Sequence, residues 1–312
     1  MTRVLVIKLG AFGDFVLAFG PFAAIRAHHP GADITLLTTA PYAEFARATP
    51  WFDRVVEDKR SRPWNLPALL RLRRVLRGFD RVYDLQTSDR SGWYFHLAGR
   101  PDWSGIARFC SRPHANPARN AMHTVERQRE QLAMAGIKAV PSPDLSFLIP
   151  KGAGEQQGEG VRQAVLIPGA ALHRPRKRWP AERFGELAQD LVRRGLVPVI
   201  VGAAADGPFA TTIHGLCPAA VDLTGRTSLL QLAETIAAAE VAIGNDTGPT
   251  HLAAALGIPT IALFSADSDP ALTRPRGDVT VLSEPDLADL TVARVAAALR
   301  PVHSPQSQSL EA

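Results

Sequence analysis

Four residues with polar or small side chains stand close together late in the sequence: Asp246, Thr247, Gly248 and His251. Pro249 suits the first turn of a helix, which the apolar residues after it would continue. The start of a helix offers free backbone N–H groups and a partial positive charge, and both favour a bound phosphate. The spacing therefore predicts an anion site. The alternative is an ordinary strand-to-helix crossover whose polar residues only cap the helix.

A second candidate is the basic run R-P-R-K-R-W at residues 174–179. From His173 to Arg178 it places five basic side chains within six positions, where they repel one another unless an anion or solvent neutralises them. Pro180 opens the helix expected next, so the charge of Lys177 adds to that of a helix N-terminus. A solvated basic loop is the other interpretation of this run.

The third candidate is the glycine-rich turn K-L-G-A-F-G-D at residues 8–14, directly after an apolar run. Its G-x-x-G spacing lacks the dinucleotide fingerprint G-x-G-x-x-G, and no Gly-Lys-Ser/Thr completes a P-loop. What remains is the carboxylate of Asp14 beside a flexible turn at the mouth of a cleft. An N-cap of the following helix is the alternative role for this side chain.

Apolar runs that alternate with amphipathic segments must position these three motifs. We expect strands at residues 4–7, 34–38, 54–57 and 81–85, and again at 165–167, 197–201, 241–245 and 260–264. We expect helices at residues 15–28 (kinked at Pro21), 43–48, 66–76, 123–135, 180–192, 229–239, 249–256 and 290–299. Residues 100–120 read as irregular. This alternation predicts α/β architecture: two Rossmann-like domains with parallel sheets that face each other across a cleft. The domain boundaries we infer are 1–150 and 163–300, with a linker at 151–162 and a disordered tail at 301–312.

Composition limits the class of protein. The 312 residues are enough for two domains, and 46% hydrophobic with 21% charged residues is typical of a globular protein. No apolar run approaches the roughly 20 residues of a membrane span, the N-terminus does not read as a signal peptide, and two widely spaced cysteines fit a reducing cytoplasm. The net charge of +5 favours anionic small molecules or lipid headgroups; with few aromatic residues and no recognition signature, nucleic acid is the least favoured partner.

The three motifs resemble, in the right order, those of the family 9 glycosyltransferases, the lipopolysaccharide heptosyltransferase group. D-T-G-P-T-H-L-A-A-A-L-G-I-P from Asp246 is similar to the nucleotide-sugar motif, K-R-W-P from Lys177 to K-x-W-P, and G-D at Gly13 to the family's catalytic turn. The resemblance spans about residues 3–275. The run S-A-D-S-D-P from Ser265 departs from the family's F-G-x-x-x-P, which leaves the accepted sugar or nucleotide open.

The resemblance implies the GT-B architecture and roles for individual residues. Asp14 would be the catalytic base and Lys177 would contact the diphosphate of a nucleotide-sugar donor. The other expected donor contacts are Lys8, Gly13, Asp206 (a ribose hydroxyl), Thr227 (near the nucleobase), Asp246, Thr247, Gly248 and His251. No cofactor is implied. Asp267 and Asp269 spell the metal-binding triplet D-x-D of another glycosyltransferase architecture, but we expect no metal there, since such triplets arise easily by chance.

The acceptor implied by the resemblance is a phosphorylated glycolipid of the lipopolysaccharide core. Arginines of the irregular segments are its candidate contacts, or contacts to the anionic inner leaflet of the membrane: Arg60, Arg62, Arg108, Arg112 and Arg119. Surface solubility is the alternative for each of them. The implied reaction is inverting transfer, with heptose from ADP-heptose as the family's usual donor, in the cytoplasm or at the inner membrane face. A nucleotide-sugar epimerase and a non-catalytic binding protein on the same scaffold remain as alternatives.

Overall fold

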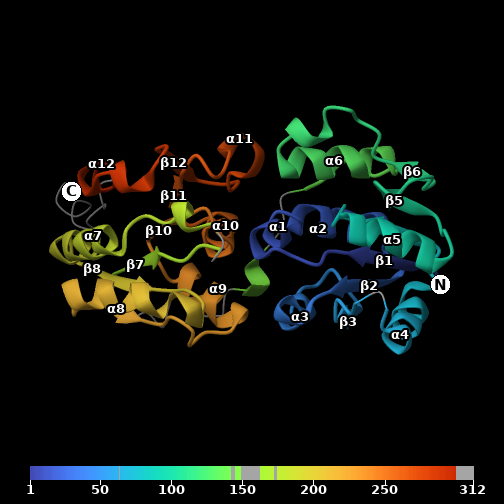
Figure 1. Ribbon diagram of the computed structural model, residues 1–312, viewed down its shortest axis with the longest axis horizontal. Helices are drawn as coiled ribbons and strands as arrows, with labels where there is room; N and C mark the ends of the chain where they lie inside the picture. The colour runs from blue at the N-terminus through green and yellow to red at the C-terminus, as the bar shows by residue number, and fades with distance from the viewer. Residues whose placement is uncertain (63, 142–144, 149–161, 172–173, 300–312) are drawn as a thin grey trace, which may run out of the picture.

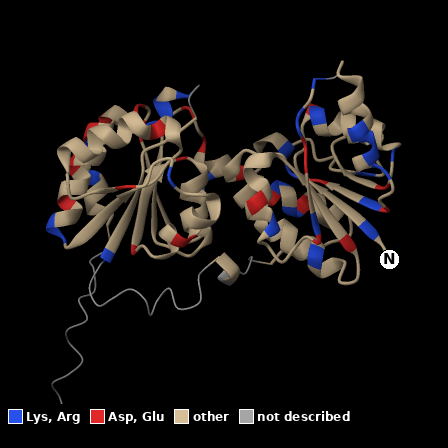
Figure 2. Ribbon diagram, turned by 90° about the horizontal axis from the view of Figure 1, so that it is seen from below, with Lys and Arg blue, Asp and Glu red and all other residues tan. Residues whose placement is uncertain are grey.

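The computed structural model describes residues 1–62, 64–141, 145–148, 162–171 and 174–299. It consists of two halves that lie side by side along the long axis of the molecule (Figure 1; Figure 2). Each half contains a six-stranded sheet in which all the strand pairs are parallel. The predicted architecture of two Rossmann-like domains is therefore confirmed.

The sheet of the N-terminal half has the strand order β3-β2-β1-β4-β5-β6. Its central strands are apolar runs buried on both faces, as parallel strands covered by helices require. In chain order the elements are β1 (Arg3–Ile7), α1 (Phe12–Val16), α2 (Phe19–His28), β2 (Asp33–Thr38), α3 (Ala40–Arg47), β3 (Arg54–Glu57), α4 (Leu66–Leu76), β4 (Arg81–Asp84), α5 (Asp89–Ala98), β5 (Trp103–Gly105), β6 (Arg112–Pro113) and α6 (Thr124–Met134).

The sheet of the C-terminal half has the order β12-β11-β10-β7-β8-β9. Its elements are β7 (Arg162–Ile167), the 3₁₀ turn η3 (Pro175–Lys177), α7 (Ala181–Arg193), β8 (Leu196–Ile200), the 3₁₀ turn η4 (Ala204–Asp206), α8 (Gly207–Leu216), β9 (Val221–Asp222), α9 (Leu229–Ala237), β10 (Val241–Asn245), α10 (Gly248–Ala255), β11 (Thr260–Phe264), α11 (Pro270–Thr273), β12 (Val279–Ser283) and α12 (Val292–Ala297). Further 3₁₀ turns are η1 (Arg119–Ala121), η2 (Ser146–Leu148) and η5 (Leu287–Asp289).

The strand orders locate the functional loops. In each sheet the chain direction of the connections reverses at one point, between β1 and β4 in one half and between β10 and β7 in the other. Loops leave such a switch point in opposite directions and open a crevice at the carboxyl ends of the strands, where α/β proteins bind ligands. The three sequence motifs follow β1, β7 and β10, so all three lie at these two crevices.

The halves contact each other through α1 and α10. A Cβ at Gly248 would lie 2.7 Å from the Cβ of Phe12, and a Cβ at Gly13 would lie 3.0 Å from the Cδ2 of His251. Each glycine therefore lets a side chain of the opposite half approach its backbone. A second contact joins α6 to the loop before β12, where His123 Nε2 lies 3.0 Å from the carbonyl oxygen of Arg274.

Gly248→Ala is expected to lower the melting temperature, because its new Cβ overlaps Phe12 and overpacking costs about 1–3 kcal/mol. Phe12→Ala in the same chain should recover part of the loss. The matched control is Gly215→Ala on α8, where a Cβ meets nothing within 4 Å and alanine favours the helix. Equal melting temperatures for Gly248→Ala and the wild type by calorimetry would contradict the close approach.

The structure corrects several sequence predictions. The first helix is not kinked at Pro21; it breaks earlier, between Val16 and Phe19, and Pro21 lies within the first turn of α2, where proline is tolerated. Residues 100–120 were expected to be irregular but contribute β5 and β6, and α5, α8, α11 and β12 were not predicted. The linker at 151–162 and the tail at 301–312 fall outside the described residues, except that Arg162 already belongs to β7.

Candidate functional site

The centre of the site is the carboxylate of Asp246, at the end of β10. It accepts a hydrogen bond from Lys177 Nζ at 2.7 Å and lies 3.3 Å from His251 Nε2. The three side chains are only 12% (Lys177), 7% (Asp246) and 5% (His251) exposed. Burial acts to raise the pKa of Asp246, but hydrogen bonds and charge from His251 and Lys177 outweigh it and hold the pKa below its ordinary value. The carboxylate therefore stays ionised and holds Lys177 and His251 in place.

Asn245 fixes the basic loop to the sheet. Its Oδ1 accepts from the backbone N–H of Trp179 at 3.0 Å, and its Nδ2 donates to the carbonyl of Pro168 at 2.8 Å. The indole of Trp179 is fully buried and donates to the carbonyl of Leu290. Asn245 thus fixes the backbone at Trp179, two residues after Lys177, and so positions the lysine. Asn245 was not among the site residues predicted from the sequence. The available signal was a polar residue that closes an apolar strand.

The N-terminus of α10 has polar atoms without partners. No side chain caps this helix, and its N-cap residue is Thr247. Within the described part of the chain, Thr247 Oγ1 and His251 Nδ1 are buried without a hydrogen bond. Buried polar atoms normally find partners, so their presence beside an uncapped helix start is typical of a ligand site.

A pocket of about 370 Å³ lies next to this helix start, between the two halves. Asp206, Thr227, Thr247 and small residues of the loops after β7 and β8 line it from one side, and Phe12, Pro41 and Tyr42 line it from the other. Its volume is in the range of small-molecule sites. The Asp206 carboxylate accepts from the N–H of Ala203 at 2.9 Å, so it holds its own loop, and Tyr42 and Phe12 are lining residues that no sequence signal had indicated.

Asp14 lies in α1, one residue from the contact between Gly13 and His251. It is not the N-cap of the helix, which is Ala11, so the capping alternative is wrong. Within the residues that the structure describes, no ion pair or side-chain hydrogen bond holds its half-buried carboxylate. A half-buried carboxylate without a fixed partner, one residue from the contact between the halves, suits a base.

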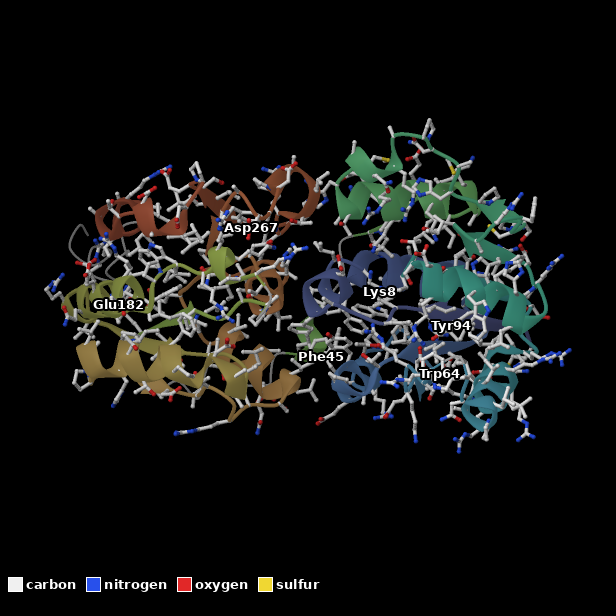
Figure 3. All side chains as sticks on the ribbon, in the orientation of Figure 1. Lys8, Phe45, Trp64, Tyr94, Glu182 and Asp267 are labelled. Carbon is white, nitrogen blue, oxygen red and sulfur yellow. The ribbon has the colours of Figure 1, made fainter. Side chains whose placement is uncertain are left out.

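Lys8 lies in the interior of the N-terminal half and not beside α10 (Figure 3), so the structure gives no support to its expected donor contact. Its Nζ donates to the carbonyl of Leu85 at 3.2 Å. Burial lowers the pKa of Lys8, and the charges of Asp14 and Asp84 oppose this shift. Burial also raises the pKa of Asp84 to about 6. Lys8 therefore lies within electrostatic range of both Asp14 and Asp84.

The raised pKa of Asp84 predicts a pH dependence of stability. The unfolded chain releases this proton near pH 4, whereas the folded chain holds it until about pH 6. The contribution of Asp84 to the free energy of unfolding is thus complete at low pH and is lost as the pH rises through about 6. The loss is on the order of 3 kcal/mol. Relative to the wild type, Asp84→Asn should therefore gain free energy of unfolding between pH 4.5 and 7.5 in urea titrations. Parallel pH curves for the two proteins would contradict the raised pKa.

The five arginines predicted to contact the acceptor have different interaction partners. Arg112 forms an ion pair with Asp102 at 2.9 Å, so its charge is neutralised within the protein. Arg62 lies over the ring of Trp64, and Arg108 lies over the ring of Phe109. Arg60 donates to the carbonyl of Leu9 in the glycine-rich turn at 2.9 Å. Arg119 donates to His114 Nδ1 at 3.1 Å, and it influences Lys8 electrostatically together with Arg127. Among these five arginines, Arg60 therefore contacts the turn that carries Asp14, and Arg119 lies within electrostatic range of Lys8 in that turn.

The D-x-D triplet has local roles. Asp269 caps α11 by accepting from the N–H of Ala271 at 2.8 Å, and the backbone N–H of Asp267 donates to Ser265 Oγ. Among the described residues, no group of three or more histidine, cysteine or acidic side chains has the geometry to hold a metal ion.

Two parallel sheets in two halves, with an uncapped helix start and a buried lysine at their junction, form the GT-B architecture. The chain belongs to glycosyltransferase family 9: the model of this family, described as Glycosyltransferase family 9 (heptosyltransferase), matches residues 69–288. The predicted family and enzyme class are thereby confirmed.

Relatives of known name agree with this assignment. The chain is 29% identical to lipopolysaccharide heptosyltransferase 1 of Pseudomonas aeruginosa over 84% of its length and 78% of the relative's. It is 28% identical to lipopolysaccharide heptosyltransferase 2 of Salmonella typhimurium, over 88% and 85% of the two chains. The fold matches an Escherichia coli heptosyltransferase solved with ADP, with a TM-score of 0.78, 23% identity and coverage of 95% and 98%.

Proposed function

We propose that this protein transfers heptose from ADP-heptose to a phosphorylated acceptor of the lipopolysaccharide core, with inversion at the anomeric carbon. The observation that carries the proposal is the Lys177–Asp246–His251 arrangement, packed against the helix of Asp14. The names of the relatives support the sugar and the acceptor, and solved heptosyltransferases with ADP and ADP-2-deoxy-2-fluoro heptose support the donor.

The donor would bind across the junction of the halves. Its nucleoside fits the pocket beside Thr227 and Asp206, where Phe12 and Tyr42 cover it. Its diphosphate would lie at the uncapped start of α10, within reach of Lys177 and of the free hydroxyl of Thr247. Since Asp246 is itself an anion, we assign it the positioning of Lys177 and His251 instead of a direct diphosphate contact.

Asp14 would act as the base. As the bond to the sugar breaks, negative charge grows on the leaving diphosphate, and Lys177 with the α10 N-terminus would stabilise it electrostatically. On the other face of the sugar, Asp14 would take the proton of the attacking acceptor hydroxyl. A base and a leaving group on opposite faces give a single displacement with inversion, and this mechanism assigns no step to a metal ion.

The acceptor would bind to the N-terminal half. Arg60 and Arg119 lie near the glycine-rich turn, and Arg127 and Lys8 add positive charge to the same region. Such a cluster suits the phosphates or carboxylates of an acidic glycolipid. The reaction would then take place in the cytoplasm at the inner membrane face. Among the described residues, no helix combines the length and apolar character needed to cross a bilayer.

The test is turnover with ADP-heptose and a core-lipid acceptor, followed by NMR of the product. Formation of ADP together with a new glycoside of inverted anomeric configuration is the expected result. Interconversion of the nucleotide sugar without acceptor would indicate an epimerase, and ADP-heptose binding without turnover would indicate a binding protein. A thermal-shift screen of nucleotide sugars comes first, because a ligand of the native state raises its stability.

A further inference from the structure

One surface of the N-terminal half combines exposed apolar side chains with unbalanced positive charge. Residues 59–79 contain seven cations and no acidic residue. The cations are Lys59, Arg60, Arg62, Arg71, Arg73, Arg74 and Arg77. The same stretch contains α4 and the residues before it, where Trp64 is 73% exposed, Leu66 65% and Leu70 54%.

The side chains of α4 divide between two faces. Leu69, Leu72, Val75 and Leu76 turn inward, where Leu72, Val75 and Leu76 pack on the core of the N-terminal half. The opposite face presents Leu66, Leu70, Arg73, Arg74 and Arg77, whose spacing of 0, 4, 7, 8 and 11 places them in one stripe. Together with Trp64, this stripe is named the α4 surface. Its first half is apolar and its second half is cationic.

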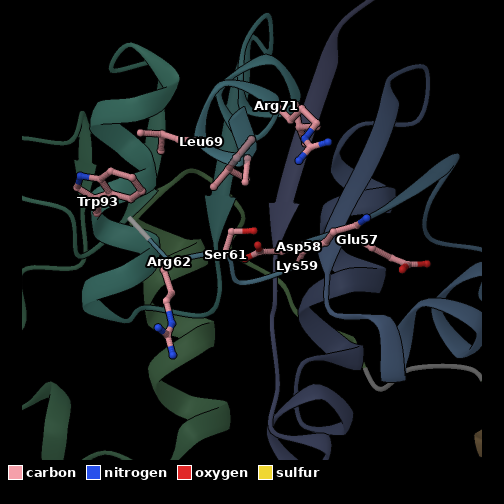
Figure 4. Close-up of a pocket in the computed structure, with 11 residues that line it drawn as sticks. Glu57, Asp58, Lys59, Ser61, Arg62, Leu69, Arg71 and Trp93 are labelled. Carbon is pink, nitrogen blue, oxygen red and sulfur yellow. The ribbon is translucent and has the colours of Figure 1, made fainter. Parts of the chain in front are cut away.

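A recess of about 200 Å³ lies beside other residues of α4, among them Leu69 and Arg71 (Figure 4). Trp93 of α5 and Glu57 at the end of β3 lie at opposite sides of it, and Leu69 and Leu72 form part of its wall. Lys59, Arg62 and Arg71 add three cations to its lining, against the acids Glu57 and Asp58. The recess thus continues the same pairing of apolar wall and positive charge.

We propose that the α4 surface binds an anionic lipid bilayer, with Trp64, Leu66 and Leu70 at the level of the headgroups and Arg73, Arg74 and Arg77 on lipid phosphates. Tryptophan and leucine beside arginine on one helix face are typical of helices that lie in the interfacial plane. The positive charge of the α4 surface determines which partner fits it. A second copy of the chain would bring cations against cations, whereas an anionic leaflet neutralises them.

The proposal specifies the membrane contact suggested for the acceptor, and it places that contact beside the cleft. Arg60 belongs to the same cationic stretch and donates to Leu9 in the turn before Asp14. A chain held by α4 would therefore present its acceptor region to the leaflet. Lipid binding itself needs no donor and no turnover, so failure of the proposed reaction would leave this inference intact.

Co-sedimentation of the full chain with vesicles tests it. Binding is expected to phosphatidylcholine vesicles that contain about one-third phosphatidylglycerol, to weaken with added salt, and to be lost with phosphatidylcholine alone. Arg73→Glu with Arg74→Glu should weaken partitioning roughly tenfold or more, and Trp64→Ser with Leu70→Ser by a similar factor. The matched control is Val192→Ser with Arg193→Glu on α7, two exposed residues of the other half, and it should bind like the wild type.

Trp64 provides a direct readout, since it is 73% exposed, whereas Trp93 is 40% exposed and Trp51, Trp103 and Trp179 are buried. Brominated lipids should quench the wild-type emission, and Trp64→Phe should remove most of that quenching while binding persists. The inference is overturned if the wild type does not bind anionic vesicles, or if the α4 and α7 variants lose binding equally. It is also overturned if the chain binds duplex DNA in preference to vesicles, or if ultracentrifugation shows that α4 mediates a dimer.

Discussion

Asp14→Asn is expected to lower kcat by roughly a hundredfold or more, because general base catalysis contributes on that order. The amide keeps the shape of the side chain but cannot accept the proton of the acceptor hydroxyl. Donor affinity should change little, since Asp14 belongs to the N-terminal half and the expected diphosphate contacts lie at α10. Steady-state kinetics with a saturating acceptor and calorimetry with ADP measure the two quantities separately.

The control for Asp14 is a neighbouring acid that the mechanism does not use. Glu44 on α3 belongs to the same half, and Glu44→Gln should leave kcat unchanged. A variant Asp14→Asn with full activity would remove this carboxylate from the mechanism. A large loss of ADP affinity in the same variant would instead place Asp14 at the donor, and the division of roles between the halves would be wrong.

Lys177→Met is expected to weaken ADP binding about tenfold or more and to lower kcat about a hundredfold, as the loss of a preorganised donor at a developing charge does. The methionine keeps the apolar stem but leaves the buried Asp246 carboxylate without its closest partner. That carboxylate would then repel the diphosphate. Isothermal titration with ADP and single-turnover kinetics measure the binding and chemical steps.

The double variant Lys177→Met with Asp246→Asn separates two roles for the lysine. If Lys177 stabilises the diphosphate directly, removal of the repelling carboxylate should restore part of the ADP affinity, but kcat should stay low. If Lys177 only neutralises Asp246, the double variant should recover both. Arg183→Met on α7 serves as a cation control outside the site, and unchanged ADP affinity in Lys177→Met itself would contradict the diphosphate role.

The prediction of elements succeeded where the signal was local. The helix Leu66–Leu76 has a side-chain cap at Asn65 and an apolar stripe, and the strand Val241–Asn245 is an apolar run before a break. Capping and periodicity involve residues within a few positions, so they can be found without a fold. The strands β5 and β6 have only three and two residues and no apolar run, so their pairing defines them: β5 pairs with β4, and β6 pairs with β5.

Several residues of the site were predicted from the sequence, but the contacts between them were not. Lys177 and Asp246 were both expected at a diphosphate, yet they are 69 positions apart and bind each other. Lys8 was expected among the donor contacts, whereas its side chain donates to the carbonyl of Leu85 in its own half. Asp84 and Asn245 were missed, although each is a polar residue that ends a buried strand.

By itself, therefore, the sequence determined the central strands and most of the helices, the alternation that builds two parallel sheets, and the start of a helix at Gly248. The tertiary structure decided that Asp246 holds Lys177 and His251, that Asp14 lies one residue from the junction of the halves, and that Phe12 and Tyr42 cover the pocket. The physical reason is the separation in sequence between the residues that form each feature. Helix starts and strand patterns depend on neighbours in the chain, whereas a buried ion pair and a pocket between lobes exist only after distant loops meet.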